Sequence, residues 1–373
     1  GREIAVADSR LQPPGLDELK AGWPDVPIYL GEFDEELFAG FNELIVSPGI
    51  SIAEPAIAGA AARGARIRGD IDLFADAADA PIIAITGSNG KTTVTTLVGE
   101  MARAAGRNVQ VGGNIGTPAL DLLDQGADLY VLELSSYQID LTFSLDCDVA
   151  VLLNITPDHL DRYDGDFQKY APSKSRLLAM QTRGHNSIAR FTDARSLGNF
   201  AEGSIASILE DVLANRGIAG EEQADWPSLQ GPHNRENAAA AIEICDILGL
   251  SSDDIRSGLQ TYPGLPHRME RVAEVAGVAY VNDSKGTNTA ASAPALAAFD
   301  NIHWILGGLA KEPGLGECEA ELGHVKAAYT IGKSGDEFAR LLEKRVSIIR
   351  SVTLEQSLFD SSNAAVSGDT VLL

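Results

Sequence analysis

Apolar residues along this chain fall into short runs that each end in polar or glycine-rich positions, which is typical of buried β-strands. The clearest helical stretch is Thr92–Ala105, where apolar side chains recur with the i, i+3, i+4, i+7 spacing. Strands that alternate with helices predict an α/β fold with parallel sheets covered on both faces. The predicted strands are Leu44–Val46, Ile82–Ile85, Leu129–Leu134, Val149–Ile155, Val278–Val281, Ile302–Leu306 and Ala328–Ile331.

Two breaks in the pattern divide the 373 residues, which are more than one core usually holds. The first break is the Ala/Asp-rich stretch before Pro81, and the second is the Pro/Gly-rich stretch at 263–266. We therefore predict three domains. They are a Rossmann-like N-terminal domain (1–78), a central P-loop-type domain (79–265) and a Rossmann-like C-terminal domain (266–373).

Both ends of the chain interrupt the expected domain pattern. Residues 3–8 suggest a strand, whereas a Rossmann-type domain usually opens with an earlier strand and a glycine-rich turn. Residues 369–373 suggest a strand with nothing after it. We expect both terminal domains to be clipped.

The net charge of the chain limits the classes of partner that it can bind. With 53 acidic and 29 basic residues, the formal net charge is −24. Nucleic acid and anionic membranes require clustered Lys and Arg, so we expect neither as a partner. The three cysteines are far apart in sequence and there is no apolar run of membrane-spanning length, which favours a cytoplasmic protein with reduced thiols. We expect it to act as a monomer.

The strongest motif is TGSNGKTT at residues 86–93, which follows a buried strand and opens the amphipathic helix. It departs from the usual phosphate-loop pattern because Ile85 stands where the first glycine belongs. Glycine-rich backbone at a helix N-terminus binds phosphate, a lysine reaches the β- and γ-phosphates, and a hydroxyl ligates Mg²⁺. A turn that merely caps a helix would leave Lys91 without a role. The motif predicts ATP and Mg²⁺ binding by Gly87, Asn89, Gly90, Lys91, Thr92 and Thr93.

Polar residues also stand at the ends of two other predicted strands. Glu133 and Ser135 come at the end of one, and His159 follows another. Because ligands of open parallel sheets bind beyond the carboxyl ends of the strands, these residues are candidate metal ligands together with Thr92. Taken singly, Glu133 also suits a helix cap, and His159 suits a loop or cap and is a less usual Mg²⁺ ligand.

These segments together resemble the Mur ligases, which build the peptide of bacterial peptidoglycan. The order of the motifs is specific and covers most of the chain. Residues 8–10, 47–50, 133–138 and 282–288 resemble the branch that adds D-glutamate. The matching segments are TGSNGKTT, GGNIGTPAL (112–120), ELSSYQ (133–138), NITPDHLDRY (154–163), HNRENAAAA (233–241), GLPHRME (264–270), NDSKGTNTAA (282–291) and LGGLAKE (306–312).

The resemblance implies an ATP-dependent ligase that joins D-glutamate to UDP-N-acetylmuramoyl-L-alanine through an acyl phosphate. One alternative is another Mur-type or folylpolyglutamate-type amide ligase. A second is a nucleotide-sugar-binding module without catalysis, or a simple ATPase.

The resemblance also implies roles for single residues. Lys91, His159 and Lys174 would be catalytic, and Lys174 falls where the family carries a carbamylated lysine that supports a metal ion. For most lysines a surface position is the ordinary alternative. Asn234 and Asn237 would read adenine, although both also suit the capping of a helix that starts after Gly231-Pro232.

Further implied contacts lie toward the two ends of the chain. Arg268 and Asp283 would line the nucleotide side, although Arg268 could instead pair with Glu270 or Glu274. D-glutamate is doubly acidic and needs local cations. The residues implied to contact the amino acid or the γ-phosphate are Lys285, Thr287 and Lys311. Asn114 is implied for the muramoyl substrate or the phosphate region. Ser9, Arg10 and Ser47 are implied for uridine diphosphate, although SPG at 47–49 is also a common turn.

Overall fold

A computed structural model describes residues 3–156, 163, 165–190, 205–209, 211–212, 223–310 and 313–373. The chain separates into two compact units. The first contains residues 1–78 and 136–145, and the second contains residues 79–135 and 146–373.

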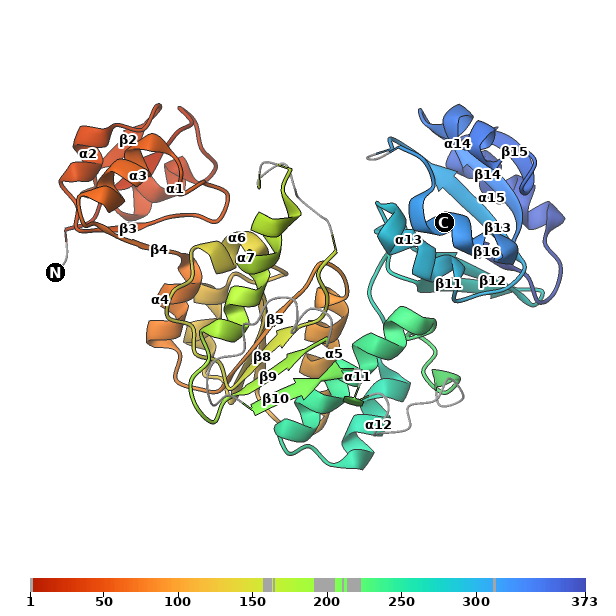
Figure 1. The fold of residues 1–373 in the computed structure, drawn as a ribbon, viewed down its shortest axis with the longest axis horizontal. Helices are drawn as coiled ribbons and strands as arrows, with labels where there is room; N and C mark the ends of the chain where they lie inside the picture. The colour runs from red at the N-terminus through yellow and green to blue at the C-terminus, as the bar shows by residue number, and fades with distance from the viewer. Residues whose placement is uncertain are drawn as a thin grey trace. The chain divides into compact units, whose positions relative to one another are not determined.

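The first unit carries two small parallel sheets with helices around them (Figure 1). In one sheet β1 (Val6–Asp8) pairs with β2 (Ile28–Leu30), and in the other β3 (Glu43–Ile45) pairs with β4 (Arg66–Arg68). A core that includes Phe38, Ile57 and Leu141 holds the unit together. Its helices are α1 (Leu16–Gly22), α2 (Glu35–Ala39), α3 (Pro55–Ala62), α4 (Asp70–Ala77) and α6 (Ser136–Asp140).

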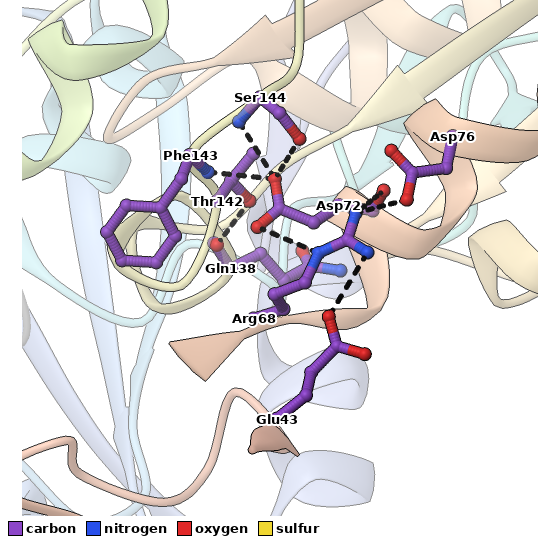
Figure 2. A network of polar contacts seen from close by, with 8 residues as sticks. All are labelled: Glu43, Arg68, Asp72, Asp76, Gln138, Thr142, Phe143 and Ser144. Atoms are coloured by element: carbon purple, nitrogen blue, oxygen red, sulfur yellow. Dashed lines mark hydrogen bonds and ion pairs between the residues drawn. The ribbon is translucent and has the colours of Figure 1, made fainter. Parts of the chain in front are cut away.

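A buried polar network joins residues 136–145 to the rest of the first unit (Figure 2). The fully buried Asp72 on α4 accepts hydrogen bonds through Oδ1 from the backbone N–H groups of Phe143 (2.8 Å) and Ser144 (2.9 Å) and from the Ser144 hydroxyl (2.8 Å). Arg68 pairs with Asp76 at 2.6 Å and donates to the Asp72 carbonyl oxygen at 2.7 Å. Because buried charges are costly unless paired, this network specifies how residues 136–145 pack.

The central sheet has six parallel strands in the order β10-β9-β8-β5-β7-β6. Figure 1 labels β10, β9, β8 and β5 of this sheet. Every residue of the central strand β5 is buried, which explains its purely apolar run before Thr86. Helices α5 and α11 pack together in the main core of this sheet. The strands are β5 (Ile82–Thr86), β6 (Val109–Gly113), β7 (Leu129–Glu133), β8 (Val149–Leu152), β9 (Asn186–Ala189) and β10 (Ile205–Ile208), and the helices include α5 (Lys91–Ala104), α7 (Phe167–Ala179), α11 (Pro232–Ile247) and α12 (Ser252–Thr261), with a 3₁₀ helix at Ala119–Gln125.

One predicted strand, Val149–Ile155, is shorter in the structure because β8 ends at Leu152. Leu153 still donates its N–H to the Thr86 carbonyl at 2.9 Å, but the Asn154 carbonyl then accepts the N–H of Ser88 at 2.9 Å. The chain beyond β8 therefore bonds to the turn that follows β5 instead of continuing the ladder.

The C-terminal sheet has the order β11-β12-β16-β13-β14-β15, in which only the β11–β12 pair is antiparallel. Apolar clusters lie on both faces, so helices cover both sides. The predicted α/β class with helix-covered parallel sheets is confirmed. The strands are β11 (Glu270–Val275), β12 (Val278–Asn282), β13 (Ile302–Gly307), β14 (Val325–Ile331), β15 (Ser347–Val352) and β16 (Thr370–Leu372), and the helices are α13 (Thr289–Leu296), α14 (Gly335–Leu342), α15 (Leu354–Ala364) and a 3₁₀ helix at Gly316–His324. Among the described residues, none of the helices has the length and apolar character needed to cross a bilayer.

Candidate nucleotide and metal site

The phosphate loop connects the end of β5 to the first residue of α5, Lys91. Gly90 caps this helix with φ of 83°, a left-handed conformation that favours glycine. A Cβ atom at Gly90 would lie close to the amide oxygen of Asn237, so the position also lacks room for a side chain. The helix N-terminus supplies unpaired N–H groups and a partial positive charge, which suit phosphate.

Two lysine side chains converge on the carbonyl of Gly87. Lys91 Nζ donates to the carbonyl oxygens of Gly87 (2.8 Å) and Ser88 (2.9 Å). Lys174 Nζ comes from α7 and donates to the same Gly87 oxygen at 2.9 Å. Lys174 is only 3% exposed, which is not the environment of an ordinary surface lysine. The loop thus carries two amines where an anionic phosphate would bind.

Oxygen-bearing side chains meet beside the loop. Thr92 donates its hydroxyl to Glu133 Oε2 at 2.8 Å, and Asn114 donates its side-chain amide to Glu133 Oε1 at 2.9 Å. Glu133 is buried at the end of β7 and is no helix cap, and the partly buried Ser135 follows two residues later. Carboxylate and hydroxyl oxygens are ligands that Mg²⁺ prefers.

The oxygen atoms at this place suit a metal ion that is bound jointly by protein and nucleotide. Among the described residues they do not form a complete set of protein ligands. In the part of the chain that the structure describes, no three His, Cys, Asp or Glu side chains gather as a metal cluster. An ion here would take oxygens from Thr92 and Glu133 and complete its shell with phosphate and water, as Mg²⁺ usually does. His159 lies outside the described residues.

A small cavity of about 110 Å³ brings together most of the predicted nucleotide residues. His233 also lines it, and its Nδ1 atom is buried without a hydrogen-bond partner among the described residues. Burial lowers the pKa of His233 to about 4, so its ring is neutral near pH 7 and suits a neutral base. The predicted residues in the lining are Asn89, Gly90, Thr93, Asn234, Asn237, Arg268, Asp283 and Lys285.

Asn234 and Asn237 are linked side by side inside α11. Asn237 donates its amide to Asn234 Oδ1 at 3.1 Å, and Asn234 donates to the Gln230 carbonyl at 3.0 Å. The residue that caps this helix is Gly231, which has no side chain to cap with. Both asparagines are buried, and neither occupies the cap position.

Arg268 and Asp283 lie where the central part of the chain passes into β11 and β12. Asp283 accepts the Met269 N–H at 2.9 Å. Burial raises the pKa of Asp283 to about 6, although the Met269 N–H and the Arg268 charge act in the opposite direction. Among the described ion pairs, Arg268 bonds to neither Glu270 nor Glu274. Glu274 pairs with Arg271, and Glu270 pairs with His267.

A larger cavity of about 370 Å³ opens at the carboxyl ends of β12, β16, β13 and β14. Thr287 and Asp283 line it, and its described lining contains neither Lys nor Arg. The predicted cation Lys285 is exposed and lines the smaller cavity instead. Lys311 lies outside the described residues.

The predicted diphosphate residues are exposed turn residues of the first unit. Ser9 and Arg10 follow β1, and Ser47 follows β3, where its carbonyl accepts the Ile50 N–H at 2.9 Å. Arg10 pairs with Asp8 at 2.7 Å and lowers the pKa of that carboxyl to about 2. β1 and β3 belong to different sheets, so the structure shows these residues as two separate turns.

Two contacts of the loop were not predicted from the sequence. Asn154 forms a reciprocal pair with Asn89, accepting its N–H at 2.8 Å and donating to its carbonyl at 3.0 Å. The fully buried Tyr170 places its hydroxyl 2.9 Å from Ser88 Oγ. A polar residue at a predicted strand end was the available signal for Asn154, whereas a tyrosine inside a helix carries none.

The parallel sheet, the phosphate loop at its carboxyl edge and the hydrogen bond from the partly buried Thr92 to the buried Glu133 define a nucleotide-binding α/β protein. Comparison with known protein families shows which family within this class the chain belongs to. Three family models match in order: "Mur ligase MurD-like, N-terminal domain" over residues 1–69, "Mur ligase middle domain" over 85–210 and "Mur ligase, glutamate ligase domain" over 267–373. The chain belongs to the Mur ligase family, as the motifs predicted.

Close relatives extend over the full chain. A protein of Marinobacter nauticus named UDP-N-acetylmuramoylalanine--D-glutamate ligase is 52% identical over 395 aligned positions, covering 100% of this chain and 87% of the relative. A protein of the same name from Novosphingobium aromaticivorans is 47% identical, covering 100% and 84%.

Solved structures share the fold at low sequence identity. The MurF ligase of Thermotoga maritima in complex with ADP has a TM-score of 0.61 at 18% identity, covering 99% of this chain and 84% of that one. The folylpolyglutamate synthase/dihydrofolate synthase of Yersinia pestis, complexed with AMPPNP and a Mn ion, has a TM-score of 0.58 at 17% identity, covering 81% and 89%.

Proposed function

We propose that this chain uses ATP and Mg²⁺ to join D-glutamate to UDP-N-acetylmuramoyl-L-alanine, in the synthesis of peptidoglycan precursors. It would act in the cytoplasm as a monomer. The observation that carries the proposal is the 52% identity, over the whole chain, to a relative named for this ligation. The partly buried phosphate loop, with the Thr92 and Glu133 oxygens beside it, supports the nucleotide part independently.

The proposed roles of the nucleotide-binding residues follow from their positions in the structure. The loop residues Gly87, Asn89, Gly90 and Thr93 would surround the ATP phosphates at the helix N-terminus. The small cavity, with its asparagine pair and the unpaired nitrogen of His233, would hold the base side of the nucleotide. Arg268 and Asp283 would border that side.

The metal would sit beside the loop. Thr92, Glu133, Ser135 and His159 would hold Mg²⁺, which when bound offsets the phosphate charge that repels an incoming carboxylate. We include Lys174 among its supports if the amine carries a carbamate, because that modification would turn a buried cation into an anion with oxygen ligands. A mass increase on the Lys174 peptide, lost on acidification, would test this.

The proposed chemistry has two steps. An oxygen of the L-alanyl carboxylate attacks the γ-phosphorus, the bond from that phosphorus to the β-phosphate bridge breaks, and acyl phosphate and ADP result. The D-glutamate amine then attacks the acyl carbon, loses a proton, and inorganic phosphate leaves as the amide forms. Lys91 would neutralise charge on the transferred phosphoryl group, since its amine already lies at the loop.

Further substrate contacts are proposed for residues outside the phosphate loop. Lys285, Thr287 and Lys311 would bind D-glutamate or the γ-phosphate near the C-terminal cavity. Asn114, which is hydrogen-bonded to Glu133, would contact the muramoyl side. Ser9, Arg10 and Ser47 would contact uridine diphosphate.

A substrate panel tests the proposed function. The purified chain is incubated with UDP-N-acetylmuramoyl-L-alanine, ATP, Mg²⁺ and single amino acids, and ADP release is measured alongside the product mass. We expect turnover with D-glutamate and little with L-glutamate, L-lysine or meso-diaminopimelate. A preference for another amine would indicate a different amide ligase, and ADP release without acceptor would indicate a simple ATPase.

A further inference from the structure

Tyr170 is a buried tyrosine that contacts the phosphate loop from outside it. It lies on α7 with no exposed surface, and its hydroxyl is 2.9 Å from the Ser88 hydroxyl. Ser88 stands between Gly87 and Asn89 and is itself 6% exposed. The contact therefore joins a helix far along the chain to the middle of the loop.

The hydrogen bonds around Ser88 fix the direction of this contact. Ser88 Oγ donates to the Thr156 carbonyl at 2.8 Å and accepts the Thr156 N–H at 2.9 Å. A serine hydroxyl has one proton and two acceptor lone pairs. Its proton is used by Thr156, so Tyr170 must be the donor, and the bond completes the Ser88 hydrogen-bonding capacity.

Tyr170 also faces the second amine at the loop. Lys174 follows one helical turn later, and its Nζ lies 5.3 Å from the centre of the Tyr170 ring, within the range of a cation–π contact. The same Nζ donates to the Gly87 carbonyl. One side chain thus contacts the loop through Ser88 and, by way of Lys174, at Gly87.

We propose that Tyr170 is a positioning residue of the nucleotide site, which holds the phosphate loop in its binding conformation through Ser88. The proposal rests on the proposed ATP site. Glycine-rich backbone is conformationally free, and ordering it on binding would cost affinity. The Tyr170–Ser88–Thr156 bonds order the middle of the loop in advance, so that less of this cost falls on nucleotide binding.

The test compares two tyrosine-to-phenylalanine substitutions that each remove one buried hydroxyl. Tyr170→Phe keeps the ring against Lys174 but removes the donor to Ser88. Tyr163→Phe is the matched control, since Tyr163 packs edge-to-face on Tyr170 at 5.4 Å while its hydroxyl lies 3.1 Å from Ser173 Oγ. From the worth of one hydrogen bond, we expect Tyr170→Phe to weaken AMPPNP binding and raise the KM for ATP about three- to tenfold.

The pattern of kinetic constants separates positioning from mere folding. Tyr170→Phe should leave kcat and the KM values of both other substrates nearly unchanged, and Tyr163→Phe should leave the KM for ATP unchanged. An unchanged KM with a fall in kcat that parallels a lower melting temperature would overturn the proposal. So would equal shifts in the two variants.

A double-mutant cycle tests the named bond. Ser88→Ala should raise the KM for ATP at least as much as Tyr170→Phe, and the double variant should bind AMPPNP no worse than Ser88→Ala. Additive losses would overturn the proposal. Calorimetric binding of AMPPNP needs no turnover, so a wild-type chain that binds it but makes no product would contradict the ligase function and leave this test intact.

Discussion

The phosphate loop and the C-terminal cavity are built in opposite ways. At the loop, Lys91, Lys174, Ser88 and Asn89 are held by hydrogen bonds of 2.8–2.9 Å from three separate segments. The larger C-terminal cavity shows no cation in its described lining, although an acidic amino acid is its proposed ligand. The proposed nucleotide side is thus held by hydrogen bonds in advance, whereas Lys285, a cation proposed for the amino-acid side, lines the smaller cavity instead.

The largest effect should come from removing the loop amine. Lys91→Ala should lower ATP-dependent product formation by about 10³-fold or more, because it removes charge stabilisation of the transferred phosphoryl group. ADP release under saturating substrates is the measurement. Lys169→Ala, an exposed lysine on α7, is the control and should keep its rate. If Lys91→Ala keeps its turnover, the phosphate loop is not the site of ATP turnover.

Crowding the loop should reduce nucleotide affinity specifically. Gly90 and Gly106 both have φ of 83°, but only at Gly90 would a Cβ meet another residue, the Asn237 amide. Alanine at either site should cost about 1 kcal/mol of stability through the backbone. Only Gly90→Ala should displace Asn237 and weaken AMPPNP binding, by about tenfold or more. Equal affinities in calorimetry would show that the Gly90–Asn237 contact is irrelevant to nucleotide.

The KM for ATP should depend on pH through Asp283, which lines the smaller cavity on the nucleotide side. The pKa of Asp283 is raised from 3.8 to about 6, so folding favours its protonated form. Its contribution therefore favours the folded state below pH 3.8 and is lost as pH rises through about 6. If the carboxylate is the form that binds nucleotide, the KM for ATP should rise as pH falls below about 6. Asp283→Asn should flatten that limb, and an unaltered limb would assign the titration elsewhere.

The smallest effect should lie on the amino-acid side. Thr287→Val removes one hydroxyl from the lining of the larger cavity and should raise the KM for D-glutamate about three- to tenfold, the worth of one hydrogen bond. The KM for ATP, measured in the same assay, should stay constant. A change confined to ATP would mean that the two cavities have been assigned the wrong way round.

The sequence predicted the elements that are buried on both faces most accurately. The apolar run at Ile82–Ile85 differs from β5 by a single residue, because nothing polar interrupts a fully buried strand. β6 was missed, since Val109–Gly113 contains Gln110 and two glycines and only two of its residues are fully buried. β9 and β10 were not predicted either, since Asn186 and Ser187 open β9 with polar residues and no residue of β10 is fully buried.

Site residues could be predicted from the sequence only where polar side chains stand at the ends of recognisable strands. Thr92 comes shortly after β5, and Glu133 is the last residue of β7. These two strands pair in the sheet, so parallel topology brings the two side chains together. Tyr170 and Lys174 come from a helix that begins more than 70 residues after the loop, and their burial against it depends on tertiary packing. Spacing along the chain carries no signal for such contacts.

The central claim is that the acceptor carboxylate attacks ATP, and an oxygen label tests it most directly. UDP-N-acetylmuramoyl-L-alanine labelled with ¹⁸O in the alanyl carboxylate is converted with ATP and D-glutamate, and the released phosphate is analysed by mass spectrometry. The account predicts one ¹⁸O atom in each phosphate formed, together with one ADP and one amide. Unlabelled phosphate formed alongside the amide would contradict it.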